Sequence, residues 1–124
     1  MFGGTSINVD DLFDLSDRMA KGVDDNGNII NGAIIEGNIQ NNKASSDFSH
    51  AEGDRTTASG YQSHTEGYQT IASGNRSHAE GNSTKAFGMS SHAEGDNTKA
   101  FGNQSHAEGY QTTASSSQSH AEGY

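Results

Sequence analysis

The sequence predicts an all-β repeat protein in which coils of 14 residues, each with short strands, stack along one axis. The motif Ser-His-Ala-Glu-Gly starts at Ser49, Ser63, Ser77, Ser91, Ser105 and Ser119, always 14 residues apart, with Thr65 replacing one Ala. Only 29% of the 124 residues are hydrophobic, 16 are Gly and none is Pro, a composition that a single globular core does not explain. A fixed period is therefore the feature that defines the architecture.

The order of these features divides the chain into three segments. Residues 1–23 form an N-terminal docking segment with a short helix, residues 24–48 form an Ile-rich β segment with a connector, and residues 49–124 form the β-roll repeats.

The first segment predicts a helix from Val9 to about Lys21. Acidic residues lie near its start, and Gly22 suits a helix end. A coiled coil and a helix packed on another surface both remain open, because two heptads are too few to decide. In either case the apolar stripe lacks a partner within the chain and is expected to dock elsewhere. The expected docking residues, on the a and d heptad positions, are Val9, Leu12, Met19 and Val23.

The second segment starts with a turn signal at 24–27 and continues with an isoleucine block, where much of the hydrophobic stabilisation is expected. One interpretation is a hairpin that turns at Asn31–Gly32. The other is a set of short strands that pair with sister chains, which is preferred because an isolated two-stranded hairpin is marginal in water. Residues 38–47 are expected to be a polar connector.

The repeats predict two short strands and two corners per coil. Side chains alternate between the two sides of a strand, so Ser49, Ala51 and Gly53 share one side and are placed inside the coil. The equivalent residues of the second strand, such as Ala58 and Gly60, are also placed inside. Glycine at each strand end is expected to supply a positive φ, and the two polar residues after it form the corner.

The outward side of the first strand carries His and Glu in every copy, whereas the outward side of the second strand changes between copies. An invariant surface indicates a constant environment, so the His/Glu side is expected to face a threefold interior or a neighbouring chain. The changing side is expected to face water. The predicted interface ladder comprises His50, Glu52, His64, Glu66, His78, Glu80, His92, Glu94, His106 and Glu108.

Histidine next to glutamate also suggests metal binding or acid–base catalysis. Six identical levels are unlike a catalytic site, which is a single constellation, and the structural interpretation is preferred, with His bonding to Glu of an adjacent coil or chain. No catalytic, cofactor-binding or metal residue is therefore assigned, and the protein is expected not to be an enzyme. A second candidate surface, for a carbohydrate or a partner, consists of Lys85, Phe87, Lys99 and Phe101. The preferred interpretation of these four residues is a cross-rung ladder of neighbours that stabilises the roll.

Charge and composition exclude further classes. The net charge of −9 argues against nucleic acid as a partner, since binding to phosphates needs a basic stripe. No apolar run is long enough for membrane insertion. The chain contains no Cys, which rules out disulfides and thiol catalysis.

The spacing Ser49-Ala51-Gly53 and Thr56-Ala58-Gly60 resembles the head repeats of trimeric bacterial adhesins of the YadA type. The heads of these adhesins are left-handed parallel β-rolls, so the resemblance implies a trimeric left-handed roll with 14-residue coils. The wording Ser-His-Ala-Glu-Gly is closer to repeats in tail fibres of phages and prophages of Gram-positive hosts. The resemblance covers residues 49–124 and implies a homotrimer with a role in host attachment.

The function expected from this resemblance is the base and shaft of a phage tail fibre or tail appendage in the virion tail. Residues 1–48 would dock on a baseplate or another tail protein. A distal tip beyond residue 124, where the chain is expected to be truncated, would bind a carbohydrate or protein receptor on the host. The alternative is a trimeric adhesin head on the bacterial surface that binds matrix or cells.

Overall fold

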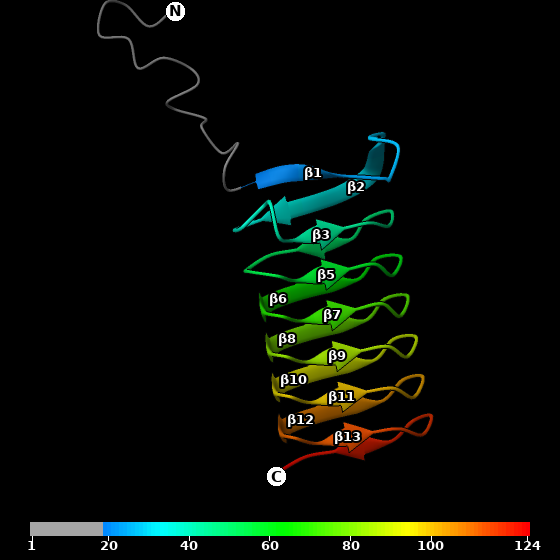
Figure 1. Ribbon diagram of the computed structural model, residues 1–124. Coiled ribbons are helices and arrows are strands. Elements are labelled where there is room, and N and C mark those ends of the chain that lie inside the picture. The colour runs from blue at the N-terminus through cyan, green and yellow to red at the C-terminus, as the bar shows by residue number, and fades with distance from the viewer. Residues whose placement is uncertain (1–18) are drawn as a thin grey trace, which may run out of the picture.

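The computed structural model describes residues 19–124, which form a single stack of β coils that starts under an N-terminal hairpin (Figure 1). The predicted all-β roll with 14-residue coils is confirmed. Two sheets form opposite walls of the stack, and each coil of the repeat region contributes one strand to each wall. Within residues 19–124 there is no helix long and apolar enough to cross a membrane.

The first wall is an eight-stranded sheet. Its strands, in spatial order, are β1 (Met19–Val23), β2 (Ile29–Glu36), β4 (His50–Ala51), β6 (His64–Tyr68), β8 (His78–Asn82), β10 (His92–Asp96), β12 (His106–Tyr110) and β14 (His120–Ala121). The second wall is a six-stranded sheet. It contains β3 (Lys43–Ala44), β5 (Thr57–Ala58), β7 (Ile71–Ala72), β9 (Lys85–Ala86), β11 (Lys99–Ala100) and β13 (Thr113–Ala114).

Equivalent residues of successive repeats lie side by side in the parallel pairs. In β10 and β12, for example, His92 pairs with His106 and Glu94 pairs with Glu108. This register follows from the sequence period, because one coil of the roll uses one 14-residue repeat. Each position of the repeat therefore becomes a column of side chains that runs along the stack.

The interior contains small side chains, as predicted. Ala51, Ala58 and their equivalents up to Ala107 are fully buried, and the Ser49 and Thr56 columns lie beside them. The prediction was wrong for Gly53, which lies at the partly exposed rim, whereas Gly60 is buried. The difference accompanies the backbone conformation: φ is +106° at Gly53 and positive at its equivalents, which bends the strand end away from the interior, whereas φ is not positive at Gly60.

The corners also correct the expectation that glycine alone supplies the positive φ. The second corner residue, which is not glycine, has a φ of 56–61° at every seventh position from Phe48 to Gln118. Such a conformation is strained for a non-glycine residue. A hydrogen bond to the preceding coil offsets this strain, as when the Arg76 N–H donates to the Tyr61 carbonyl at 2.7 Å. Gly60 has no positive φ, and it is needed because a Cβ there would overlap the backbone of Gly74.

The N-terminal part of the described chain departs most from the predictions. Met19–Lys21, expected to end a helix, belong to strand β1, while residues 9–18 of that helix lie outside the described residues. A strand is favoured here because β1 pairs antiparallel with β2, with a shift of register between Lys21 and Val23. The hairpin turns at residues 24–28, where the Asp24 carboxylate accepts hydrogen bonds from the N–H groups of Asn26 and Asn28, both at 2.9 Å.

Both interpretations of the isoleucine block were wrong in detail. No turn occurs at Asn31–Gly32, since β2 runs through it with a positive φ at Gly32. Instead of pairing with sister chains, as the second interpretation expects, β2 pairs with β1 and β4 of the same chain. The block is only partly buried: Ile35 is 8% exposed, but Ile29 is 64% exposed. The hairpin instead covers the end of the stack, where an open sheet edge would otherwise remain.

The roll begins one coil earlier than the repeat. Ile34 pairs with His50, sixteen residues on, whereas Lys43 pairs with Thr57, fourteen residues on. The corner between β2 and β3 is therefore two residues longer than in the repeats. Part of the predicted connector, Lys43–Ala44, is accordingly a strand of the second wall.

Candidate functional site

The outward surface of the eight-stranded sheet, which we call the His/Glu face, consists of two columns of side chains. The six imidazole rings of the chain stack along it, with centroids of neighbouring rings 4.7–4.9 Å apart and ring planes within 11° of parallel. This stacking follows from the parallel register, which places each His directly beside the next. The predicted ladder thus exists within a single chain.

Each histidine lies next to the glutamate of the preceding coil. The distance from Nε2 to Oε1 is 3.0 Å for His64 and Glu52, and 3.2 Å for His106 and Glu94. His78 approaches Glu66 at 3.4 Å but makes no hydrogen bond with it. The expected bond between His and Glu of an adjacent coil is therefore confirmed at most levels. Side chains of the ladder between Glu36 and Glu108 are 31–37% exposed, so they remain accessible to a further partner.

Neighbouring glutamates of the column shift one another's pKa. A hydrogen bond with Glu66 is the main cause that raises the pKa of Glu80 to about 7, and partial burial and Glu94 add to it. The same hydrogen bonding to Glu80 lowers the pKa of Glu66 and that of Glu94. The raised pKa of Glu80 between two neighbours with lowered pKa values reduces the repulsion among carboxylates in the column near neutral pH.

The histidine column is held in its neutral form at its centre. Burial, followed by the charge of His64, lowers the pKa of His78, and burial, followed by His78, lowers that of His92. A stack of charged imidazoles would be repulsive, so the neutral form is compatible with ring stacking at neutral pH.

Four groups of two His and one Glu bring their ligand atoms within 4.8 Å of one another. Their members are His50–Glu52–His64, His78–Glu80–His92, His92–Glu94–His106 and His106–Glu108–His120. Imidazole and carboxylate are suitable ligands for zinc. However, the rings stack in parallel and each Nε2 points to a glutamate, so two rings do not converge on one point. The geometry fits a ladder better than a metal centre.

The N-terminal end of the His/Glu face carries exposed apolar side chains. Ile34 stands beside His50 in the histidine column and is 40% exposed, and the expected docking residues Met19 and Val23 are 40% and 45% exposed on β1. The other two expected docking residues, Val9 and Leu12, lie outside the described residues. This end of the His/Glu face therefore carries a mixed patch, in which Lys21 and Glu36 lie among the apolar side chains of Met19, Val23 and Ile34.

The outward surface of the six-stranded sheet, which we call the variable face, has a different chemistry. Its first column is Lys43, Thr57, Ile71, Lys85, Lys99 and Thr113, and its second is Ser45, Ser59, Ser73, Phe87, Phe101 and Ser115. These columns contain three lysines and no acidic residue. Phe87 and Phe101 stack with centroids 5.2 Å apart, as the ladder interpretation predicts, and each is 41% exposed.

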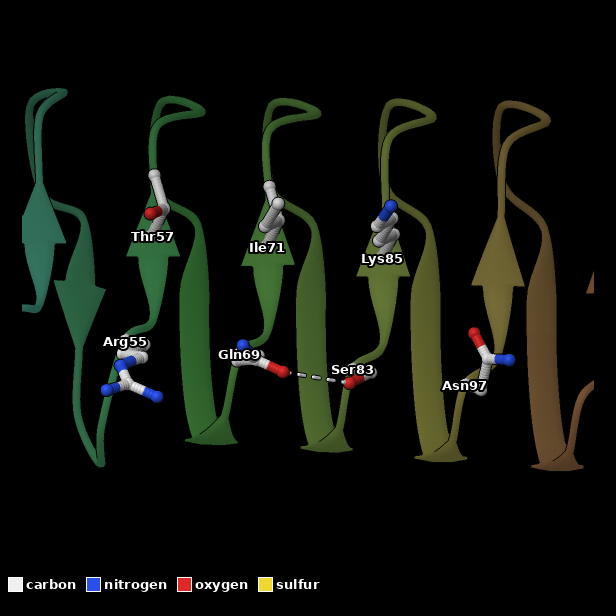
Figure 2. A pocket seen from close by; sticks show the side chains of 7 residues that line it. All are labelled: Arg55, Thr57, Gln69, Ile71, Ser83, Lys85 and Asn97. Atoms are coloured by element: carbon white, nitrogen blue, oxygen red, sulfur yellow. Dashed lines mark hydrogen bonds between the residues drawn. The ribbon is translucent and has the colours of Figure 1, made fainter.

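A groove follows the variable face along its border with the corner (Figure 2). Arg55, Gln69, Ser83 and Asn97 line one side, and Thr57, Ile71 and Lys85 line the other. The sequence analysis singled out Lys85 here but missed the four corner residues. Their regular spacing of 14 residues is a signal that would have placed them in one column.

Comparison with protein families supports this architecture directly. The YadA head domain repeat matches in two copies, over residues 51–77 and 93–115. The chain carries YadA-like head repeats. These head repeats indicate an adhesin-like protein with a surface-exposed location. The chain matches no curated protein and no solved structure.

Proposed function

We propose that the protein is a non-enzymatic, elongated homotrimer that mediates attachment to a host, as the base and shaft of a phage tail fibre or tail appendage. The observation that supports this proposal is the unbroken parallel stack with one constant outward face. A stack of this kind becomes longer by adding copies of one short repeat, because each coil makes its stabilising contacts only with the coils next to it. The Ser-His-Ala-Glu-Gly repeats favour the tail fibre.

The proposed assembly surface is the His/Glu face together with the patch of Met19, Val23 and Ile34. The exposed apolar side chains at its N-terminal end lack cover within the described chain. The interior of one roll contains mainly Ala, Ser and Thr, so burial within a single chain is modest. Association of three copies would cover this patch and withdraw the ladder from water.

Light scattering tests this assembly, with an expected mass of about three times the 13.0 kDa of one chain. Glu94→Arg places a long cation in the glutamate column and is expected to shift the mass towards that of one chain. Ser73→Arg introduces the same side chain on the variable face and is expected to leave the trimer intact. A wild-type mass of 13.0 kDa would overturn the proposal.

A bacterial adhesin head is the second candidate, since the matching repeat is that of YadA heads. The two candidates predict different locations. An antibody raised against residues 49–124 would label the tails of phage particles in the first case and the surface of intact bacterial cells in the second. Electron microscopy with gold-labelled antibody separates these outcomes, and labelling of neither would contradict both.

A further inference from the structure

The groove on the variable face runs along the roll repeats and has a volume of about 420 Å³ (Figure 2). Its walls are two rows of side chains that run along the stack and cross several coils. The corner row starts at Arg55 and ends at Asn97, and the strand row starts at Thr57 and ends at Lys85. A ligand in this groove would thus lie parallel to the long axis of the roll.

The charge of the groove is opposite to that of the chain. The chain carries a net charge of −9, yet Arg55 and Lys85 line the groove and no acidic residue does. Lys99 continues the lysine column one coil further. Asp54 precedes Arg55, and its carboxylate accepts a hydrogen bond from the Asn38 side chain at 2.9 Å. The groove therefore attracts an anion on an otherwise acidic molecule.

One of the two cations is positioned before any ligand binds. The Arg55 guanidinium donates a hydrogen bond to the Tyr68 hydroxyl and lies 5.6 Å from the centre of its ring. A held guanidinium loses less conformational entropy when it binds an anion, which favours affinity. Arg55 is thus suited to hold a carboxylate or phosphate at one end of the groove.

The neutral residues of the groove favour a sugar chain. The Gln69 and Asn97 amides and the Thr57 and Ser83 hydroxyls offer both donors and acceptors, which suit the hydroxyl groups of a sugar. Coils repeat at ~4.8 Å, which is close to the length of one pyranose unit in an extended chain. The stacked rings of Phe87 and Phe101 lie two residues beyond the lysines and add exposed apolar surface to the variable face.

We infer that this groove binds an anionic linear polysaccharide, with Arg55 and Lys85 holding its acidic groups and Gln69 and Asn97 holding its hydroxyls. The acidic group is a carboxylate or a phosphate, which share this chemistry. The inference deepens the proposed function and rests on it, because it names the ligand class through which the roll itself contributes to attachment.

Binding of the full chain to immobilised polymers tests the inference. Polygalacturonate supplies carboxylates, a phosphodiester-linked mannan supplies phosphates on a sugar chain, dextran is the neutral control and oligo(dT) represents nucleic acid. Lys85→Gln is expected to weaken binding to the preferred polymer about tenfold, the typical effect of losing one charge-assisted hydrogen bond. Arg76→Gln, the matched control at the opposite corner, makes the same charge change outside the groove and is expected to leave affinity within about twofold.

Two further measurements complete the test. Gln69→Ala leaves the charge unchanged and is expected to weaken binding as well, which a purely electrostatic attraction would not produce. Lack of binding to both anionic polymers, equal binding to dextran or oligo(dT), or equal loss in Arg76→Gln would each overturn the inference. A trimer that binds neither anionic polymer overturns the ligand assignment alone, whereas a monomer overturns the proposed assembly.

Discussion

The His/Glu face and the variable face belong to the same coils and differ in what their side chains contact. On the His/Glu face, each histidine stacks on its equivalents and lies next to the glutamate of the preceding coil, as His64 does with Glu52. A change at one level therefore disturbs two others. On the variable face, residues such as Thr57 and Ile71 alternate without a shared partner, and a change affects one level. The repeats must therefore carry the same residues on the His/Glu face, whereas the residues on the variable face are free to differ.

The largest expected effect concerns what both faces share, the spacing between coils. In Gly88→Ala, the new Cβ would overlap the carbonyl of Gly102 in the next coil, so the stack must open. The free energy of unfolding is expected to fall by about 3 kcal/mol. Gly81→Ala, at the end of the His/Glu strand, adds a positive φ of 108° to the same overlap and should cost more. Chemical denaturation measures both.

Gly27→Ala is the matched control for these two variants. Gly27 also has a positive φ, but a Cβ there would meet open space in the hairpin turn. Only the conformational cost remains, about 1 kcal/mol. Equal losses in the Gly27 and Gly88 variants would show that close approach between coils does not limit the roll.

A second prediction concerns the point where the two sheets are tied together at the first coil. The Asn42 side chain donates to the carbonyls of Glu36 at 2.6 Å and Gly53 at 2.8 Å, and accepts from the Thr56 N–H at 3.0 Å. Asn42→Ala removes the acceptor of the buried Thr56 N–H and one donor each from the Glu36 and Gly53 carbonyls, of which Gly53 keeps the Asn38 N–H, and should cost about 2 kcal/mol of stability. Asn41→Ala, at the neighbouring exposed position, should cost little, and thermal unfolding distinguishes the two. A similar loss in both variants would contradict the role of Asn42.

A third prediction concerns the pH dependence of stability, which is expected to arise from the His/Glu face. The pKa of Glu80 is raised to about 7 in the folded chain, so its contribution to stability is complete below its unfolded value of about 4.5 and is lost as pH rises through 7. Glu80→Gln should therefore lose less stability than the wild type between about pH 5 and pH 8. Because the side chain is partly exposed, the difference is expected to be about 1 kcal/mol or less.

Histidine gives the opposite slope. The lowered pKa values of His78 and His92 mean that their contribution is complete above about 6.5 and is lost as pH falls through the folded values. The double variant His78→Gln and His92→Gln should therefore resist acidification better than the wild type. Melting temperatures measured at several pH values check both slopes. If both variants show the same pH dependence as the wild type, titration of these residues does not affect stability.

The smallest effect is expected on the variable face. Phe87→Ser places there the residue that the equivalent position of the preceding coil, Ser73, already carries. Loss of the contact with Phe101 should cost about 0.5–1 kcal/mol and leave assembly unchanged. Thermal unfolding and light scattering measure the two quantities. A dissociated trimer in this variant would show that the variable face, and not the His/Glu face, is the assembly surface.

Several features were predictable because they depend on period alone. The alternation in Ser49-His50-Ala51-Glu52 assigned the inside and the outside of the coil, and the constant spacing placed all histidines in one column. The groove was harder to predict from the sequence, because its two rows combine corner and strand positions, as in Arg55 and Thr57. Their proximity depends on how the corner bends, which a linear pattern does not contain.

By itself, the sequence determined the coil length, the column structure and the small interior, since a strict 14-residue repeat with alternating small residues permits only one register of stacking. Tertiary structure decided the N-terminal end. Met19–Lys21 have a helix-compatible pattern, but pairing of β1 with β2 makes them a strand. The first coil has a corner that is two residues longer, so it does not follow the 14-residue period and cannot be recognised from it. The physical reason is that hydrogen bonding between strands satisfies backbone groups across distant residues, and this long-range term outweighs local helix preference.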